Sequence, residues 1–217
     1  MLALIGMGVS AVAVGGVLAY ELLGGFQRPE VKEIEMPLGG KTAMMKLTIG
    51  YGGVLGGIVG AFNAAPSGNV RKLAILYDNP ADLKEIKSTP DHGRFLSGVI
   101  LDDFPEDERS EAEKKLAAAG YKKYPLFSGK AYAADYKIRR WPFLSASLAC
   151  SLPTVFSRVE NCTEKRKNHK VRMIIEFFAE NVNGCMCSVT DTNALENYLY
   201  EDVRANEPKP GAAKKYQ

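Results

Sequence analysis

The chain has 217 residues, which is enough for one domain of ordinary size and an attached segment. Its 28 Lys and Arg residues nearly balance 25 Asp and Glu residues, and a formal charge of +3 does not provide the basic stripe that a nucleic-acid-binding surface needs. Four cysteines are too few for a disulfide scaffold, and two histidines argue against a histidine-rich metal site. We therefore expect neither direct binding of nucleic acid nor a bound metal or other cofactor.

The chain begins with an uncharged run, residues 2–20, which is rich in Leu, Val, Ala and Gly. A helix of this length spans roughly 28 Å, close to the hydrocarbon thickness of a bilayer. We interpret residues 1–24 as a transmembrane signal-anchor; a cleaved signal peptide is the alternative, but no basic residue precedes the run. Basic residues follow it, which places the N-terminus in the lumen and the remainder in the cytosol: Arg28, Lys32, Lys41 and Lys46.

In the cytosol, cysteines are expected to remain thiols. Cys185 and Cys187 flank Met186 and would lie on one face of a strand. Core packing is the preferred interpretation of this pair, because the sequence places no further metal ligands nearby; a redox role is left open.

The elements expected after the anchor begin with a linker over residues 25–41 and a strand starting near Thr42. The uncharged stretch 47–70 is interpreted as that strand followed by a buried, glycine-rich helix, in preference to a second membrane span. A capping-box pattern at Ser110 and Glu113, with Gly120 as a left-handed cap, predicts a helix over 106–119. A second helix is predicted over 142–164, and further strands over 72–77, 95–101, 122–127, 131–139, 171–178 and 185–190.

This order of elements contains the unit β-α-β-β twice and predicts an α+β fold. The strands 122–127 and 131–139 are expected to form a hairpin around Ser128-Gly129. Two such units can join their sheets edge to edge and leave a cleft for a small molecule between helices and sheet. The domain is expected to cover 42–200, followed by a short disordered tail over 201–217.

Two stretches of sequence resemble the GyrI-like (SOUL-related, multidrug-sensor) ligand-binding domains. The first runs from Leu73 through Tyr77-Asp78-Asn79-Pro80, and the second is Arg172-Met173-Ile174-Ile175-Glu176-Phe177-Phe178. A membrane anchor directly before such a domain is similar to the testis-expressed protein 264 family. That resemblance implies a single-pass protein of the endoplasmic reticulum membrane that acts as a receptor or adaptor in selective autophagy of that organelle or in membrane-linked quality control.

The same resemblance implies autophagy ubiquitin-like proteins as partners, together with valosin-containing protein. The receptor's long acidic tail has no counterpart here, since about seventeen residues follow Tyr200. The nearest candidate motif is Tyr200-Glu201-Asp202-Val203, an aromatic-x-x-aliphatic pattern that would bind by adding a strand to a partner's sheet edge. Packing of Tyr200 on the domain is the alternative.

The resemblance also places a ligand-binding acid at Glu176, in the middle of an apolar strand where an unpaired carboxylate is costly to bury. Aromatic rings beside this acid would hold a small hydrophobic or cationic ligand; Tyr77 and Trp141 are the first choices, ahead of Tyr132, Tyr136, Phe143 and Phe178. A solvent-facing Glu176 is the alternative. The resemblance also implies a rival function, hydrolysis of a small molecule. In that function Glu176 would serve as a general base. With no nucleophile-base pair in the sequence, binding is favoured over catalysis.

Overall fold

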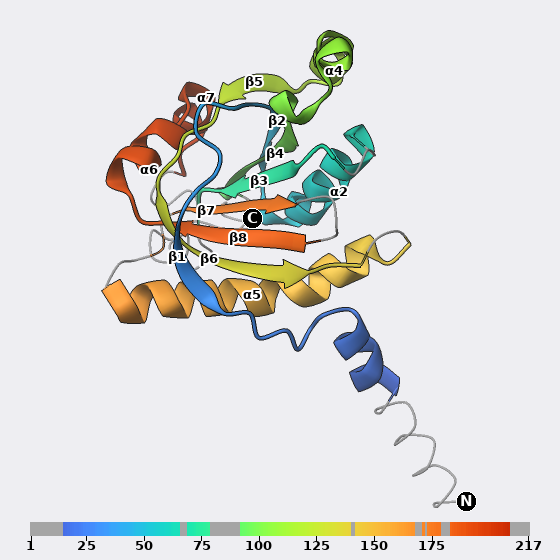
Figure 1. Ribbon diagram of the computed structural model, residues 1–217, viewed down its shortest axis with the longest axis vertical. Helices are drawn as coiled ribbons and strands as arrows, with labels where there is room; N and C mark the ends of the chain where they lie inside the picture. Colours follow the sequence, from blue (N-terminus) through green and yellow to red (C-terminus); the bar gives the residue numbers. More distant parts are fainter. Residues whose placement is uncertain are drawn as a thin grey trace, which may run out of the picture.

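The structure is a computed structural model in which residues 15–65, 69–78, 92–139, 142–167, 171, 173–178 and 183–208 are described. The strands of this part form one antiparallel sheet in the order β1-β6-β8-β7-β3-β4-β2-β5 (Figure 1). Their bounds are Val31–Glu35 (β1), Thr42–Ile49 (β2), Lys72–Leu76 (β3), Arg94–Ile100 (β4), Lys122–Pro125 (β5), Lys130–Lys137 (β6), Ile174–Phe178 (β7) and Asn183–Val189 (β8). The α+β class is confirmed.

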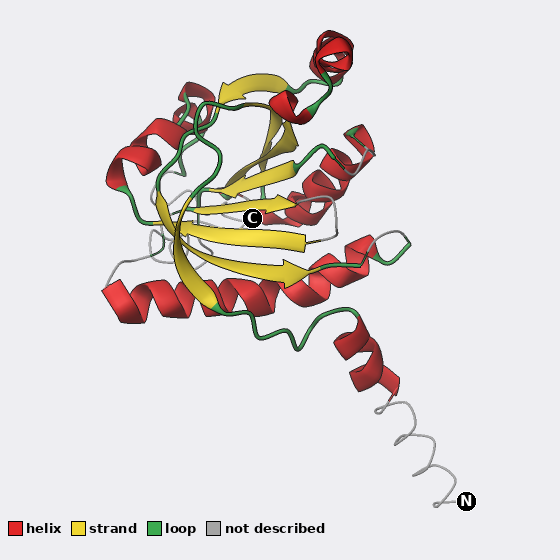
Figure 2. Ribbon diagram, in the orientation of Figure 1, coloured by secondary structure: helices red, strands yellow, loops and turns green. Residues whose placement is uncertain are grey.

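The repeated β-α-β-β order is also confirmed, as β2-α2-β3-β4 and β6-α5-β7-β8. The two units join where β3 pairs with β7, with Ala74 opposite Glu176. Helices α2 and α5 contact each other and pack on the sheets of their own units, and Figure 2 separates them by colour from the strands. The helices are Val54–Ala64 (α2), Glu106–Ala118 (α4), Leu144–Lys167 (α5), Thr192–Tyr198 (α6) and Glu201–Ala205 (α7), with short 3₁₀ turns at Tyr51–Gly53 (η1) and Leu101–Asp103 (η3).

The hairpin predicted around Ser128-Gly129 is wrong. β5 pairs with β2 at one edge of the sheet, whereas β6 pairs with β8 and β1 near the other edge. The chain between them crosses one face of the sheet, and Leu126 is buried there. A local turn motif therefore misled the prediction, because burial of this apolar crossing segment determines the strand pairing instead.

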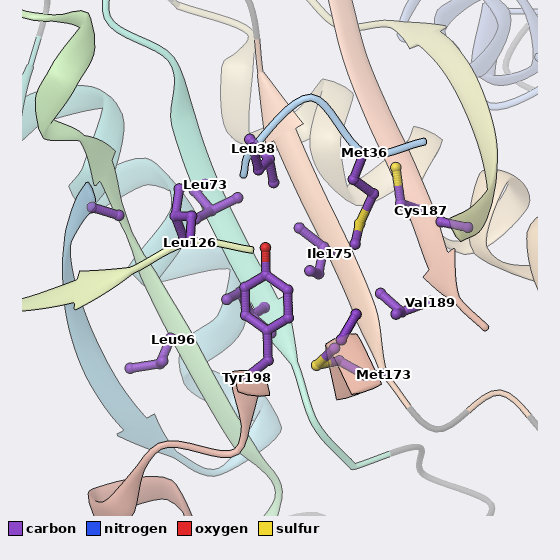
Figure 3. Packing of buried hydrophobic residues seen from close by; sticks show 14 of the residues in the cluster. Met36, Leu38, Leu73, Leu96, Leu126, Met173, Ile175, Cys187, Val189 and Tyr198 are labelled. Atoms are coloured by element: carbon purple, nitrogen blue, oxygen red, sulfur yellow. The ribbon is translucent and has the colours of Figure 1, made fainter. Parts of the chain in front are cut away.

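Each face of the sheet carries its own core. On the face covered by α2 and α5, Ile58, Leu148 and Val155 pack on strand residues such as Ile174 and Met186. Figure 3 shows the opposite core, in which the strand residues Leu73 and Ile175 are covered by Met36, Leu38 and Leu126 from loops and by Tyr198 from α6. Because both faces are covered, β7 and β3 are apolar nearly throughout, as strands buried on both sides require.

The expected linker over 25–41 is wrong for most of its length. Residues 31–35 form edge strand β1, in register with β6, and Met36 and Leu38 are buried in the core beyond it. Residues 15–22 are helical, while residues 2–14 of the predicted membrane span lie outside the described residues. None of the helices in the described part of the chain is long and apolar enough to cross a membrane.

The C-terminal region also differs from the prediction. Helix α6 begins at Thr192, after the N-cap residue Asp191. The Asp191 carboxylate accepts hydrogen bonds from the Asn193 and Ala194 amides, a capping signal that the sequence analysis did not use. Helix α7 follows within the predicted tail, so the ordered chain extends beyond residue 200; residues 209–217 lie outside the described residues.

Among the predicted helices, α4 begins at Glu106 as predicted and ends at Ala118, one residue before the predicted end. Gly120 has a φ of 84°, the left-handed cap conformation. Ser110 lies inside the helix, which begins after Pro105, so its capping role is wrong. Helix α5 continues through Pro153.

Candidate functional site

The carboxyl group of Glu176 is fully enclosed by the protein. Glu176 is 1% exposed in the middle of β7, between Ile174 and Phe178, and points to the same helix-covered face as they do. The expectation of a buried acid is thereby met, and the solvent-facing alternative is excluded. β7 is buried on both faces because α5 covers one side and the loop-closed core covers the other.

The hydroxyl of Tyr136 donates a hydrogen bond to Glu176. The two residues lie on β6 and β7, with β8 between them, so the tyrosine ring must pass across an intervening strand. It does so over Gly184, which pairs with Tyr136 in the β6–β8 register. A Cβ atom on Gly184 would overlap the Tyr136 ring. The missing side chain at position 184 therefore makes this hydrogen bond sterically feasible.

Burial raises the pKa of Glu176 well above its ordinary value, because the charged form loses its hydration. The Tyr136 hydroxyl is its hydrogen-bond donor in the described structure, and a single neutral donor compensates little of that loss. The carboxyl group therefore stays protonated to a higher pH than an exposed glutamate does.

A cavity of about 300 Å³ opens beside Glu176 between the two helices and the sheet. Its lining is almost entirely apolar: Val54 from α2, Leu152, Pro153 and Phe156 from α5, and Leu76, Val171, Ile174 and Met186 from the strands and their ends. Glu176 and Asp78 supply the charged groups among the described lining residues. This volume is at the lower end of ligand sites in proteins and suits a small one- or two-ring molecule.

Asp78, at the end of β3, is held by Arg94. The guanidinium donates Nε–H to Oδ2 over 2.8 Å and Nη2–H to Oδ1 over 2.7 Å, and both side chains are largely buried. Arg94 also donates to the carbonyl of Val203 over 3.0 Å. Asp78 is therefore neutralised by a bidentate partner, whereas Glu176 has no cation beside it among the described residues that line the cavity.

The aromatic residues first chosen from the sequence do not meet Glu176 in the structure. Tyr77 points to the opposite face of the sheet, where its hydroxyl donates to the Tyr198 carbonyl over 2.9 Å. That placement is a correction: a strand alternates its faces, so Tyr77 and its neighbour Leu76, which lines the cavity, point in opposite directions. Trp141 lies outside the described residues.

Of the remaining aromatic candidates, Tyr136 contacts the acid and Phe178 packs with Phe62 on the same face, with ring centroids 5.3 Å apart. Phe143 is exposed, and Tyr132 donates to Glu33. The residues missed by the sequence analysis are Gly184 and Asp78 as site residues, together with Pro153; a register between strands 131–139 and 183–190 would have indicated Gly184.

The proposed partner motif is folded into the domain. Val203 is 0% exposed in α7, and the Tyr200 hydroxyl donates to the Pro125 carbonyl over 2.6 Å. Asp202 accepts from the Tyr124 hydroxyl. In this arrangement the segment is helical with its aliphatic residue buried, so it cannot add as a strand to a partner sheet; the alternative in which Tyr200 packs on the domain is the observed one.

Cys185 and Cys187 lie on one face of β8, as predicted, with sulfur atoms 3.8 Å apart. Both are buried in the loop-closed core. Their mutual hydrogen bond and burial raise the pKa of Cys185, which keeps the thiol neutral and poorly nucleophilic. No cluster of three or more His, Cys, Asp or Glu side chains suited to a metal ion occurs among the described residues.

Comparison with known proteins gives structural likenesses only. No protein-family model matches the sequence, and no curated protein sequence matches it. An integron cassette protein from the mobile metagenome of Vibrio cholerae is similar over 76% of this chain and 97% of its own, with 16% identity and a TM-score of 0.42. A hydrolase from Listeria innocua (13% identity, TM-score 0.39, 76% and 95% covered) and the EcmrR C-terminal domain (13%, 0.40, 76% and 100%) are also similar. These likenesses assign no activity to the present chain.

Proposed function

We propose that the protein is a small-molecule-binding module of GyrI-like type, which takes an apolar, positively charged ligand into the cavity beside Glu176. The observation that carries this proposal is a buried acid, without a described cationic partner, in the wall of an otherwise apolar cavity. A ligand with a ring system and an ammonium group would fill the apolar volume and supply the missing charge.

The energetics favour such a ligand over a neutral one. An ionised carboxylate is costly in this cavity on its own, so the empty site keeps its proton to a higher pH than an exposed glutamate does. A bound cation pairs with the carboxylate in a low-dielectric setting, where the attraction is stronger than in water, and displaces that proton.

Hydrolysis with Glu176 as general base is the second function that the resemblance implies. The described lining of the cavity contains no Ser, Cys, His or Lys, and therefore no nucleophile-base pair. A carboxyl group with a raised pKa would act as a base only above that pKa. Binding thus has more support than turnover.

The membrane and autophagy roles are predictions from the sequence. Anchoring in the endoplasmic reticulum membrane through residues 2–20 is supported by the apolar run in the sequence. Capture of autophagy ubiquitin-like proteins through Tyr200 and Val203 requires α7 to leave the domain, because Val203 has no exposed surface. The binding module is therefore proposed ahead of the receptor.

The test is a fluorescence titration of the full chain with the naphthylmethylammonium ion and its neutral isostere naphthylmethanol. The wild type is expected to bind the cation at least tenfold more tightly than the alcohol. Glu176→Gln, which keeps the shape of the side chain and its hydrogen-bond acceptor, should lose that preference, while the surface control Glu111→Gln should retain it. Equal affinity of wild type and Glu176→Gln for the cation would contradict the proposal.

A further inference from the structure

The large apolar side chains that the described structure leaves exposed gather where the chain enters the domain. They are Val17, Leu18, Tyr20, Leu22, Phe26 and Phe143, with Ile49 as an outlier at the end of β2. Five of the six belong to residues 15–26, at the end of the uncharged run, and Phe143 precedes the first turn of α5. A contiguous apolar set of this kind marks an interaction surface.

Helix α5 holds the chain at this entry point through three hydroxyl groups. Ser147 and Ser151 each donate to the carbonyl of Leu23, over 3.0 and 3.2 Å, and Thr154 donates to the carbonyl of Gly25 over 2.9 Å. The three donors are spaced four and three residues apart, which places them on one face of α5. The Leu23 and Gly25 carbonyls lie in the turn that follows the helical residues 15–22, so these hydroxyl groups tie that turn to α5.

The end of β6 holds the same segment from a second side. Gln27 donates to the Lys137 carbonyl over 2.6 Å and accepts from the Lys137 amide over 2.7 Å, while Arg139 donates to the carbonyl of Leu22 over 3.1 Å. Residues 22–27 are therefore fixed to the domain by backbone carbonyls and one side chain. The end of the predicted anchor and the start of the predicted linker are thus held on the domain by hydrogen bonds.

We propose that this entry surface docks the domain directly against an anionic lipid bilayer, with Phe26 and Phe143 at the headgroup level. The orientation of the domain relative to the helical residues 15–22 is set by the hydroxyl clamp, which we define as Ser147, Ser151 and Thr154. The bilayer is the occupant favoured by the chain itself, because the helical residues 15–22 end the uncharged run. The inference rests on that run reaching a bilayer, and it is independent of the ligand cavity.

Charge at the entry surface suits acidic lipid headgroups. Arg28, Lys137 and Arg139 lie beside the apolar set, with Glu21 and Asp135 as acidic neighbours. Juxtamembrane basic residues are attracted to the negative surface of a cytoplasmic leaflet, and aromatic side chains favour the interface between headgroups and acyl chains. The apolar and the basic side chains would thus both contact the anionic bilayer.

Tryptophan quenching in vesicles tests the docking. The full chain is reconstituted in phosphatidylcholine–phosphatidylserine vesicles with brominated acyl chains, using Trp141→Phe together with Phe143→Trp, so that one tryptophan reports. The matched control carries Ile49→Trp in the same background; β2 is five strand spacings, roughly 24 Å, from β6. Docking predicts strong quenching at position 143 and little at position 49. Equal, weak quenching at both positions, in chains that float with the vesicles, would overturn the proposal, as would a chain that does not float.

The clamp has a test of its own in the same assay. Replacing all three hydroxyl groups, as Ser147→Ala, Ser151→Ala and Thr154→Val, should reduce quenching at position 143 at least twofold while flotation is retained. Ser145→Ala, on the same helix with an exposed side chain, should change nothing. The milder Ser151→Ala single variant serves if the triple variant does not fold. Unchanged quenching in folded clamp variants would overturn the role assigned to these hydroxyl groups.

Discussion

Tyr136 on β6 donates a hydrogen bond to Glu176 on β7 by passing its ring over Gly184 of the intervening strand. Three strands thus cooperate in one polar contact inside an apolar layer. The arrangement positions the carboxyl group beside the cavity and leaves its second oxygen for another partner. The consequences of this contact can be tested by substitution.

Removing the Tyr136 hydroxyl should lower the stability of the fold and raise the pKa of Glu176. Tyr136→Phe leaves the buried carboxyl without its donor, which costs about 1–3 kcal/mol of unfolding free energy. The pKa of Glu176 should rise further, because a donor to the ionised form is lost. Chemical denaturation gives the free energy, with Tyr132→Phe, whose hydroxyl bonds near the surface, as a control expected to change it less. Equal losses in both variants would contradict a special role for the Tyr136 hydroxyl.

A methyl group at position 184 should disrupt the hydrogen bond between Tyr136 and Glu176. Gly184→Ala places a Cβ atom in the Tyr136 ring, so the ring must move and its hydroxyl withdraw from Glu176. The expected cost is about 1–3 kcal/mol, typical of overpacking a core. Gly56→Ala on α2, where no atom lies within 4 Å of the added methyl, is the control and should be neutral or slightly stabilising. A neutral Gly184→Ala would show that the ring does not occupy this position.

Stability should fall with rising pH through the titration of Glu176. Its pKa in the folded protein is raised by burial, so the folded state holds the proton more tightly than the unfolded chain. The stabilising contribution is full below the unfolded pKa and is lost between about pH 5 and the raised value. Thermal unfolding of Glu176→Gln should lack this decline. A variant with the same pH profile as the wild type would contradict the assignment.

Asp103 should have the opposite effect, because its titration lowers stability as the pH falls. Burial alone would raise the pKa of this carboxyl, but hydrogen bonds from Arg71 and Lys41, at 2.6 and 2.8 Å, outweigh it and lower the value. Its stabilising contribution is therefore present above about pH 5 and is lost as the pH falls through the lowered pKa. Asp103→Asn should be less stable near neutrality and should lose less stability on acidification. An identical acid transition in both proteins would refute this role.

The C-terminal helix should behave as part of the domain. Val203→Ala removes two buried methyl groups and should cost about 2 kcal/mol, whereas Glu201→Ala at an exposed position should cost little. Capture of autophagy ubiquitin-like proteins by the wild type, lost on Val203→Ala in a still-folded chain, would instead show that α7 opens to bind.

Local patterns were sufficient to predict much of the fold. Apolar alternation predicted the strands of both β-α-β-β units, and Gly120 correctly indicated the end of α4. Short-range patterns failed where strand pairing depends on segments that are distant in sequence. Ser128-Gly129 looked like a hairpin turn, yet its flanking strands pair at opposite ends of the sheet. The edge strand β1 was missed because its pairing with β6 spans about a hundred residues.

The candidate site was predictable in part. The resemblance to GyrI-like domains pointed to Glu176, while its apolar strand alone left open whether the carboxylate is buried or faces solvent. Its partner could not be chosen among several aromatic residues, because the choice depends on strand register: Tyr136 reaches Glu176 only through its pairing with Gly184. Tyr77 was misplaced for the same reason, as it points to the other face of the sheet.

The most direct measurement of the central claim is the number of protons released when the naphthylmethylammonium ion binds. Calorimetric titration at several pH values, in two buffers of different ionisation enthalpy, yields this number from the difference in observed heat. The proposed exchange of a proton for a cation at Glu176 predicts proton release on binding in the wild type at pH values below the raised pKa, and none in Glu176→Gln. Tight binding of the cation by the wild type without proton release would contradict it, because the carboxyl group would then take no part in holding the charge.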